Sequence, residues 1–177
     1  MSDALPSPVP IKKDNYGWLV FFIFLVVASA LAAGIMIGFN RMIQLTPEML
    51  ETAMQRWKQK GPRNYRMVYT KQLNEEQRVT KFVVTVRAGK VEEVLMNGKP
   101  LEPDPETHHD PRIYHSMNQL FNDIDRFMNI DARPNQPKVF VTADFDEQTG
   151  ALRRYVRRVM GTTQRIELRV IEVKELS

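Results

Sequence analysis

Hydrophobic and polar positions divide the chain into one long apolar run and a following region in which the two kinds alternate. From Asn15 to Asn40 no side chain is charged, and no later segment is comparable. At about 1.5 Å per residue, a helix of this length measures about 39 Å and exceeds the ~30 Å hydrocarbon core of a bilayer. The pattern predicts a transmembrane helix over residues 15–40, preceded by a disordered, proline-rich tail over residues 1–14.

The remaining residues, 41–177, predict a single α+β domain. Apolar residues at helical spacing predict two helices, over residues 47–60 and 116–129. Period-two alternation between turn signals predicts six strands, over residues 64–73, 78–88, 90–96, 138–144, 152–160 and 164–173. Because short connections make neighbouring strands antiparallel, we expect a six-stranded antiparallel sheet with two helices on one face, in the order α-β-β-β-α-β-β-β.

The apolar run has two interpretations. Ala28-Ser29-Ala30 has the small-x-small form that signal peptidases accept, which favours cleavage and a secreted domain. The run is nevertheless much longer than the roughly 7–15 residues of a signal core, which favours an uncleaved signal-anchor. Lys12 and Lys13 precede it within a short tail. Arg41, Arg56, Lys58 and Lys60 follow the run, so a literal count of positive charges favours a cytoplasmic C-terminal domain. Because the two lysines adjoin the run in a short tail that is hard to translocate, we expect instead a single-pass cell-membrane protein with a cytoplasmic N-terminus and an extracytoplasmic domain.

Small residues recur every four positions within the predicted span, at Ala30, Gly34 and Gly38. Such spacing places them on one helix face and lets a second helix approach closely. Besides the lipid bilayer, the expected partners are therefore a second copy of the chain or another membrane protein. The alternative is that the spacing arises by chance, because glycine and alanine are common in membrane helices.

Composition excludes several classes of chemistry. The chain has no cysteine, which rules out disulfides, thiolate catalysis and cysteine metal sites. Its glycines after the apolar run fall at helix ends and turns, and Ser116 falls at a helix cap, so neither a phosphate-binding loop nor a serine nucleophile is indicated. We expect no catalytic residue and no cofactor.

The histidines of the chain lie close together in a loop. His108, His109, Asp110 and His115 provide imidazole and carboxylate groups that metal ions bind, so a metal-binding protein or a metal-dependent enzyme using the loop over residues 104–115 is one hypothesis. Their spacing matches no regular ligand pattern. The alternative is a solvated loop, stiffened by proline, without a metal.

The last part of a chain whose net charge is +4 is rich in arginine. Arg153, Arg157, Arg165 and Arg169 form a candidate patch for an anionic ligand, and anionic lipid headgroups or polysaccharide are the expected partners. We expect no nucleic acid there, because the domain is predicted to lie outside the cell. The alternative is that Glu167 pairs across the strands and leaves an ordinary charged sheet face.

The domain resembles a group of small exported bacterial domains of unknown function. The similarity rests on an aromatic first strand at residues 65–69, V-x-V-x-x-G-x-V at residues 84–91, Leu120-Phe121-Asn122-Asp123-Ile124, and an acidic turn that ends at Gly150. It implies export and provides no catalytic residues. Because caps, turns and the sheet account for the conspicuous residues, we expect a non-enzymatic binding or accessory domain.

Overall fold

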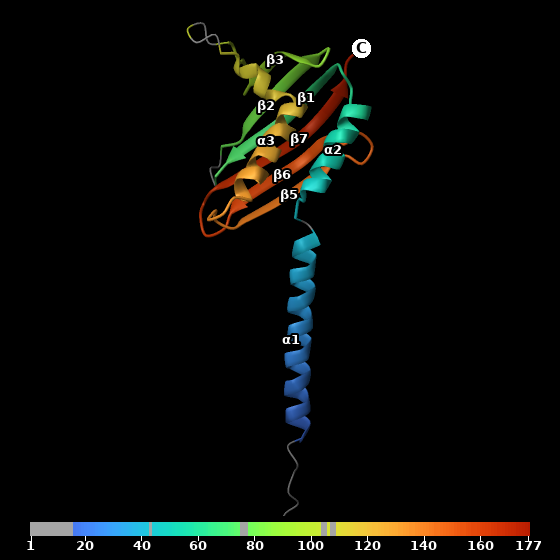
Figure 1. The fold of residues 1–177 in the computed structure, drawn as a ribbon, viewed down its shortest axis with the longest axis vertical. Helices are drawn as coiled ribbons and strands as arrows, with labels where there is room; N and C mark the ends of the chain where they lie inside the picture. Colours follow the sequence, from blue (N-terminus) through green and yellow to red (C-terminus); the bar gives the residue numbers. More distant parts are fainter. Residues whose placement is uncertain (1–15, 43, 75–77, 104–105, 107–108) are drawn as a thin grey trace, which may run out of the picture. The chain divides into compact units, whose positions relative to one another are not determined.

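The chain divides into two units, which are described separately. The computed structural model describes residues 16–42, 44–74, 78–103, 106 and 109–177, and within the first helix it describes side chains as far as residue 32. The first unit, residues 1–43, contains helix α1 (Tyr16–Met42) (Figure 1). The second unit, residues 44–177, contains the other helices and the strands.

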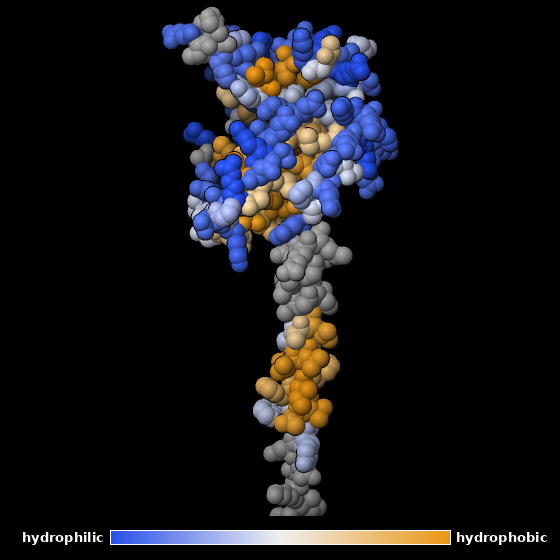
Figure 2. Space-filling view, viewed as in Figure 1, coloured by the Kyte–Doolittle hydropathy of each residue, from blue (hydrophilic) through white to orange (hydrophobic). Residues whose placement is uncertain are grey.

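The prediction of a transmembrane helix is contradicted by the structure. α1 exposes apolar side chains such as Phe21, Ile23 and Leu25 (Figure 2). Within the described residues, no helix is both long enough and apolar enough to cross a membrane. The predicted signal-anchor and single-pass membrane location rested on that helix and are corrected with it.

Helix α2 (Pro47–Lys60) begins and ends where the sequence predicts. The side chain of Thr46 accepts a hydrogen bond from a backbone N–H of the first turn, at 3.2 Å. Pro47 occupies that turn, where its missing N–H leaves no bond unmade. At the other end, the N–H of Gly61 donates to the last turn at 2.7 Å. The buried stripe of the helix consists of Leu50, Ala53 and Trp57.

Seven antiparallel strands form one sheet, which is one strand more than predicted. The sheet has the order β4-β3-β2-β1-β7-β6-β5. The strands are β1 (Tyr65–Leu73), β2 (Thr80–Arg87), β3 (Lys90–Met96), β4 (Lys99–Pro100), β5 (Val139–Phe145), β6 (Leu152–Val159) and β7 (Arg165–Glu175). The unpredicted β4 has two residues and exists through its pairing with β3, because so short a strand has no periodicity of its own. The α+β class with an antiparallel sheet is confirmed.

A short 3-10 helix, η1 (Pro111–His115), leads into helix α3 (Met117–Asp131). Asp110 caps η1 by accepting a hydrogen bond from the N–H of Arg112 at 3.0 Å, and Ser116 caps α3 by accepting one from its first turn at 3.2 Å. The apolar stripe predicted for α3 is confirmed. Its buried members are Met117, Leu120, Phe121 and Ile124.

Helices α2 and α3 cover the same face of the sheet (Figure 1). Tyr65 of β1 connects them: the ring of Trp57 lies edge-on at 5.5 Å, and the hydroxyl accepts a bond from the N–H of Met117 at 3.1 Å. The core fills this face, and apolar residues are visible between the hydrophilic outer surfaces of the two helices (Figure 2). Among the described residues of the second unit, no helix covers the opposite face, which we call the open face.

Candidate functional site

Side chains of β1, β6 and β7 alternate between the two faces of the sheet. Tyr155 of β6 and Leu168 of β7 are opposite each other and buried beneath the helices. The residues on either side of them therefore project from the open face. The register shift between Val68 and Tyr69 leaves Ile171 of β7 without an opposite residue, so Val173 returns to the covered face and Lys174 to the open face. Six basic residues of the three strands project from the open face, and we call them the open-face cluster: Arg66, Arg154, Arg158, Arg165, Arg169 and Lys174.

The register of the strands places these basic residues directly opposite one another. They form three like-charge pairs: Arg154–Arg169, Arg158–Arg165 and Arg66–Lys174. Directly opposite residues have Cβ atoms about 4.5–5.5 Å apart, and like charges in such positions destabilise a sheet. The open face therefore concentrates positive charge at the expense of stability.

Glu167 neutralises part of this charge. Its Oε1 accepts hydrogen bonds from Arg154 at 2.8 and 3.0 Å, and its Oε2 accepts one from Arg165 at 2.5 Å. Burial by itself would raise the pKa of Glu167, but the bonds from the two guanidinium groups hold this pKa below its ordinary value. Among the described residues, the exposed Arg158 and Arg169 have no ion-pair partner. Their charges remain available to a ligand.

The structure divides the four predicted arginines between different places. Arg165 and Arg169 belong to the open-face cluster. Arg157 lies under α3, where it donates to Asp131 at 2.5 and 2.8 Å. Arg153 binds Asp146 in the turn between β5 and β6 at 2.8 Å. The predicted set is therefore not one patch.

The hypothesis that the histidine loop binds a metal ion gains no support from the described residues. His108 lies outside the described residues. His115 contacts a tyrosine of β1, His109 lies against a tyrosine ring of η1, and Asp110 binds the guanidinium of Arg112 at 2.9 Å. In the described part of the chain, no group of three His, Cys, Asp or Glu residues could hold a metal ion. A metal site that includes His108 stays a prediction.

The predicted interface of small residues lies on α1. Ala30 is exposed there, whereas the surroundings of Gly34 and Gly38 lie outside the described residues. This interface was predicted for a transmembrane helix. Because that helix is corrected above, the interface is not carried further.

Comparison with known proteins identifies the family of the chain. Residues 49–153, which extend from α2 to the start of β6, match a family of unknown function, DUF6174. The match covers more than half of the chain. The chain belongs to the DUF6174 family. No curated protein matches it. Membership agrees with the resemblance to domains of unknown function and carries no information on anchoring or bacterial origin.

The DUF6174 match includes β1 but not β7, and it ends at Arg153, the second residue of β6. Within the matched region, the open-face cluster contributes only Arg66. The cluster is therefore mainly a feature of the C-terminal hairpin of this chain.

Sequence reasoning missed the like-charge pairs of the DUF6174 domain, although a signal for them exists. The turn between β6 and β7 is fixed by the bond from the N–H of Val159 to the carbonyl of Gln164 at 3.0 Å. Once a hairpin turn is fixed, the register follows, because each step outward from the turn pairs one residue of each strand. Arg158 and Arg165 are the first such step.

Proposed function

We propose that residues 44–177 form a non-catalytic binding domain whose open face recognises an anionic partner. The observation that carries this proposal is the presence of three like-charge pairs on one face of three adjacent strands. Opposing like charges repel, and Glu167 offsets this repulsion only at Arg154 and Arg165. An oxyanion placed over a pair replaces that repulsion with charge-assisted hydrogen bonds, for which the planar guanidinium of arginine is well suited.

The arrangement favours a partner with several anions over a single small anion. Neighbouring strands are about 4.8 Å apart, so the pairs extend over roughly 10 Å across β1, β7 and β6. A flat sheet face does not enclose a small ligand, but a polymer with regularly spaced charges can lie along it. We therefore infer an acidic polysaccharide as the partner.

A non-catalytic role is supported by the chemistry of the cluster. Guanidinium and ammonium groups stay protonated at neutral pH and have no free lone pair. They provide charge and hydrogen-bond donors, but neither a general base nor a nucleophile.

Calorimetric titration of the full chain with a heparin octasaccharide tests the proposal. The double variant Arg158→Gln/Arg169→Gln removes two charges of the cluster that have no ion-pair partner among the described residues, and we expect it to weaken binding by about tenfold or more. The matched control, Lys58→Gln/Lys60→Gln, removes the same charge from the exposed side of α2 and should change the affinity by no more than about twofold. Equal losses in the two variants, or no binding by the wild-type chain, would contradict the proposal.

Two further probes distinguish the source of the anions. Vesicles with and without anionic lipid test whether the partner is an array of lipid headgroups. A single-stranded oligonucleotide tests whether the partner is a nucleic acid. Nucleic acid was excluded above only because the domain was predicted to lie outside the cell, and that prediction is corrected. The heparin octasaccharide should bind more tightly than either probe. Tighter binding of the vesicles or the oligonucleotide would overturn the assignment to polysaccharide.

A further inference from the structure

A separate pocket of about 230 Å³ lies on the covered face, between α3 and the sheet. Residues of β1, η1, α3, β6 and β7 line it. Its apolar wall consists of Leu120, Ile124, Phe127, Ile166 and Leu168. Its polar lining residues are Tyr69, Lys71, Tyr114, His115, Asp123, Arg126 and Tyr155.

The hydroxyl of Tyr155 is buried without a hydrogen-bond partner. Tyr155 is only 1% exposed, and no described residue donates to its Oη or accepts from it. Burial raises the pKa of this phenol, so the hydroxyl keeps its proton and can donate. Buried polar groups in folded proteins nearly always have a partner. Since Tyr155 lines the pocket, a ligand in the pocket can provide the acceptor.

His115 offers a second donor. The hydroxyl of Tyr69 lies 2.5 Å from Nδ1 of this histidine. Burial raises the pKa of Tyr69, whereas burial, followed by the charge of Lys71, lowers the pKa of His115. The tyrosine therefore donates and Nδ1 accepts. A neutral imidazole that accepts at Nδ1 carries its proton on Nε2, which remains available for another partner.

Lys71 and Arg126 both bring positive charge to the pocket. Asp123 is already engaged, because it forms an ion pair with Arg126 at 3.6 Å and accepts a bond from Gln119 at 3.4 Å. Lys71 has no ion-pair partner within the described residues. The pocket thus combines a cation, two hydrogen-bond donors and an apolar wall.

We propose that this pocket binds a small organic carboxylate with an apolar body. The carboxylate accepts a hydrogen bond from the Tyr155 hydroxyl and pairs with Lys71, while the body packs against Phe127 and Leu168. Drug-sized ligands occupy pockets of about 300–1,000 Å³, so this smaller pocket suits a body of roughly one ring. The pocket and the open-face cluster lie on opposite faces of the sheet, and each can be tested without the other.

The first experiment titrates the full chain with sodium benzoate, followed by NMR, and repeats the titration with benzamide, which has the same shape without the charge. We expect saturable binding of benzoate and at least about tenfold weaker binding of benzamide. Lys71→Gln should weaken benzoate binding by about tenfold or more. Lys81→Gln removes an exposed charge of β2 on the open face, opposite Thr70, and should leave the affinity unchanged.

Tyr155→Phe separates binding from folding. Because the hydroxyl has no partner to lose in the free chain, the variant should keep or raise the melting temperature while its affinity for benzoate falls about tenfold. The proposal is overturned if benzoate does not bind saturably, or if benzoate and benzamide bind equally. It is also overturned if Tyr155→Phe lowers the melting temperature and leaves the affinity unchanged.

Discussion

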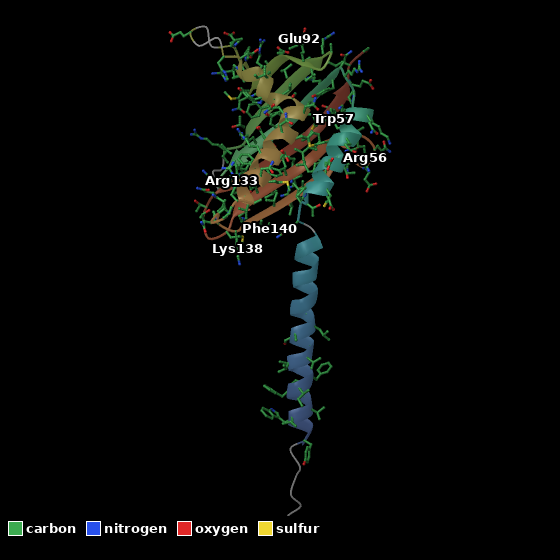
Figure 3. All side chains as sticks on the ribbon, viewed as in Figure 1. Arg56, Trp57, Glu92, Arg133, Lys138 and Phe140 are labelled. Carbon is green, nitrogen blue, oxygen red and sulfur yellow. The ribbon has the colours of Figure 1, made fainter. Side chains whose placement is uncertain are left out.

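Gly150 holds helix α2 against the turn between β5 and β6. Its φ is +78°, and a Cβ at this position would lie 2.4 Å from the carbonyl oxygen of Ala53. Arg56, labelled in Figure 3 beside Trp57 on α2, reaches the same turn and donates to the carbonyl of Glu147 at 2.9 Å. The sequence identified Gly150 as a turn residue, but the contact with α2 depends on tertiary packing.

Replacement of this glycine by alanine should be strongly destabilising. In Gly150→Ala, left-handed backbone strain adds to the clash with α2, and we expect the free energy of unfolding to fall by about 3 kcal/mol. The matched control is Gly89→Ala, at φ +76° with no atom within 4 Å of the new Cβ, which should lose only about 1 kcal/mol. Urea unfolding followed by circular dichroism measures both. Equal losses would show that α2 does not constrain the position.

His115 makes the stability of the domain depend on pH. Burial holds its pKa in the folded chain below the ~6.5 of an unfolded chain. Between those two pKa values, the unfolded chain binds a proton that the folded chain does not. The contribution of His115 to the free energy of unfolding is therefore fully present above about pH 6.5, and it is lost as the pH falls toward the pKa of the folded chain. The charged and titratable groups that face the ring are Tyr69, Lys71 and Asp123.

Urea unfolding of the wild-type chain at about pH 7.5 and about pH 5.5 should show lower stability at the acidic pH. His115→Gln keeps a hydrogen-bonding side chain but cannot titrate, so the difference between the two pH values should shrink in this variant. A difference of the same size in both proteins would assign the pH dependence to other groups.

Strand β7 has neighbours on both sides only in its first half. β6 pairs with it as far as Arg169, whereas β1 pairs with it to its last residue. The N–H of Leu176 donates to Asn64 at 3.0 Å, and hydrogen-bonded pairs alternate along antiparallel strands. The backbone N–H and C=O of Lys174 therefore point toward β1, whereas those of Val173 point away from β1. A hollow of about 730 Å³, lined in part by β7 residues, adjoins Val173.

This edge predicts a difference between two adjacent amides. By NMR hydrogen exchange, the N–H of Val173 should exchange at least about tenfold faster than that of Lys174, since only the latter is bonded to a neighbouring strand. Val173→Pro should then be tolerated, whereas Lys174→Pro removes a ladder bond and should destabilise the domain by about 3 kcal/mol. Equal protection of the two amides would mean that the edge of β7 is covered.

Elements with local signals could be predicted from the sequence, and those without could not. α2 was located to the residue because its cap, its first-turn proline and its final glycine are all adjacent to it in sequence. The ends of the six longer strands differ from the prediction by no more than about two residues. η1 and β4 were missed because neither is long enough to show a periodic pattern of hydrophobic residues. The transmembrane prediction was wrong because it rested on the absence of charge over the whole run.

The candidate site was also predicted only in part, because its contacts join residues that are far apart in the sequence. Alternation correctly separates Arg154 and Arg158 from Arg157. It cannot show that Arg157 binds Asp131, because the two residues are 26 positions apart and meet only when α3 packs on the sheet. Glu167 pairs with Arg154 as one of the alternatives expected, but the cluster retains more positive charge than this single carboxylate can neutralise.

At the scale of the whole molecule, the two faces of the sheet have different roles. One face carries α2, α3 and the core, whereas the other presents basic side chains of β1, β7 and β6. An exposed, uncompensated charge of one sign attracts partners of the opposite sign over roughly one Debye length, about 10 Å at moderate salt. We therefore propose that the covered face stabilises the domain and that the open face recognises an anion.

The most direct test of this account is an NMR titration of the full, isotope-labelled chain with the heparin octasaccharide. We predict that the largest shifts fall on Arg66, Arg158 and Arg169 and their side-chain Nε–H groups. The indole of Trp57 and the ring of His115, both on the covered face, should not shift. Shifts confined to α2 and α3, or a spectrum unchanged at saturating octasaccharide, would contradict the claim that the open face binds an anionic partner.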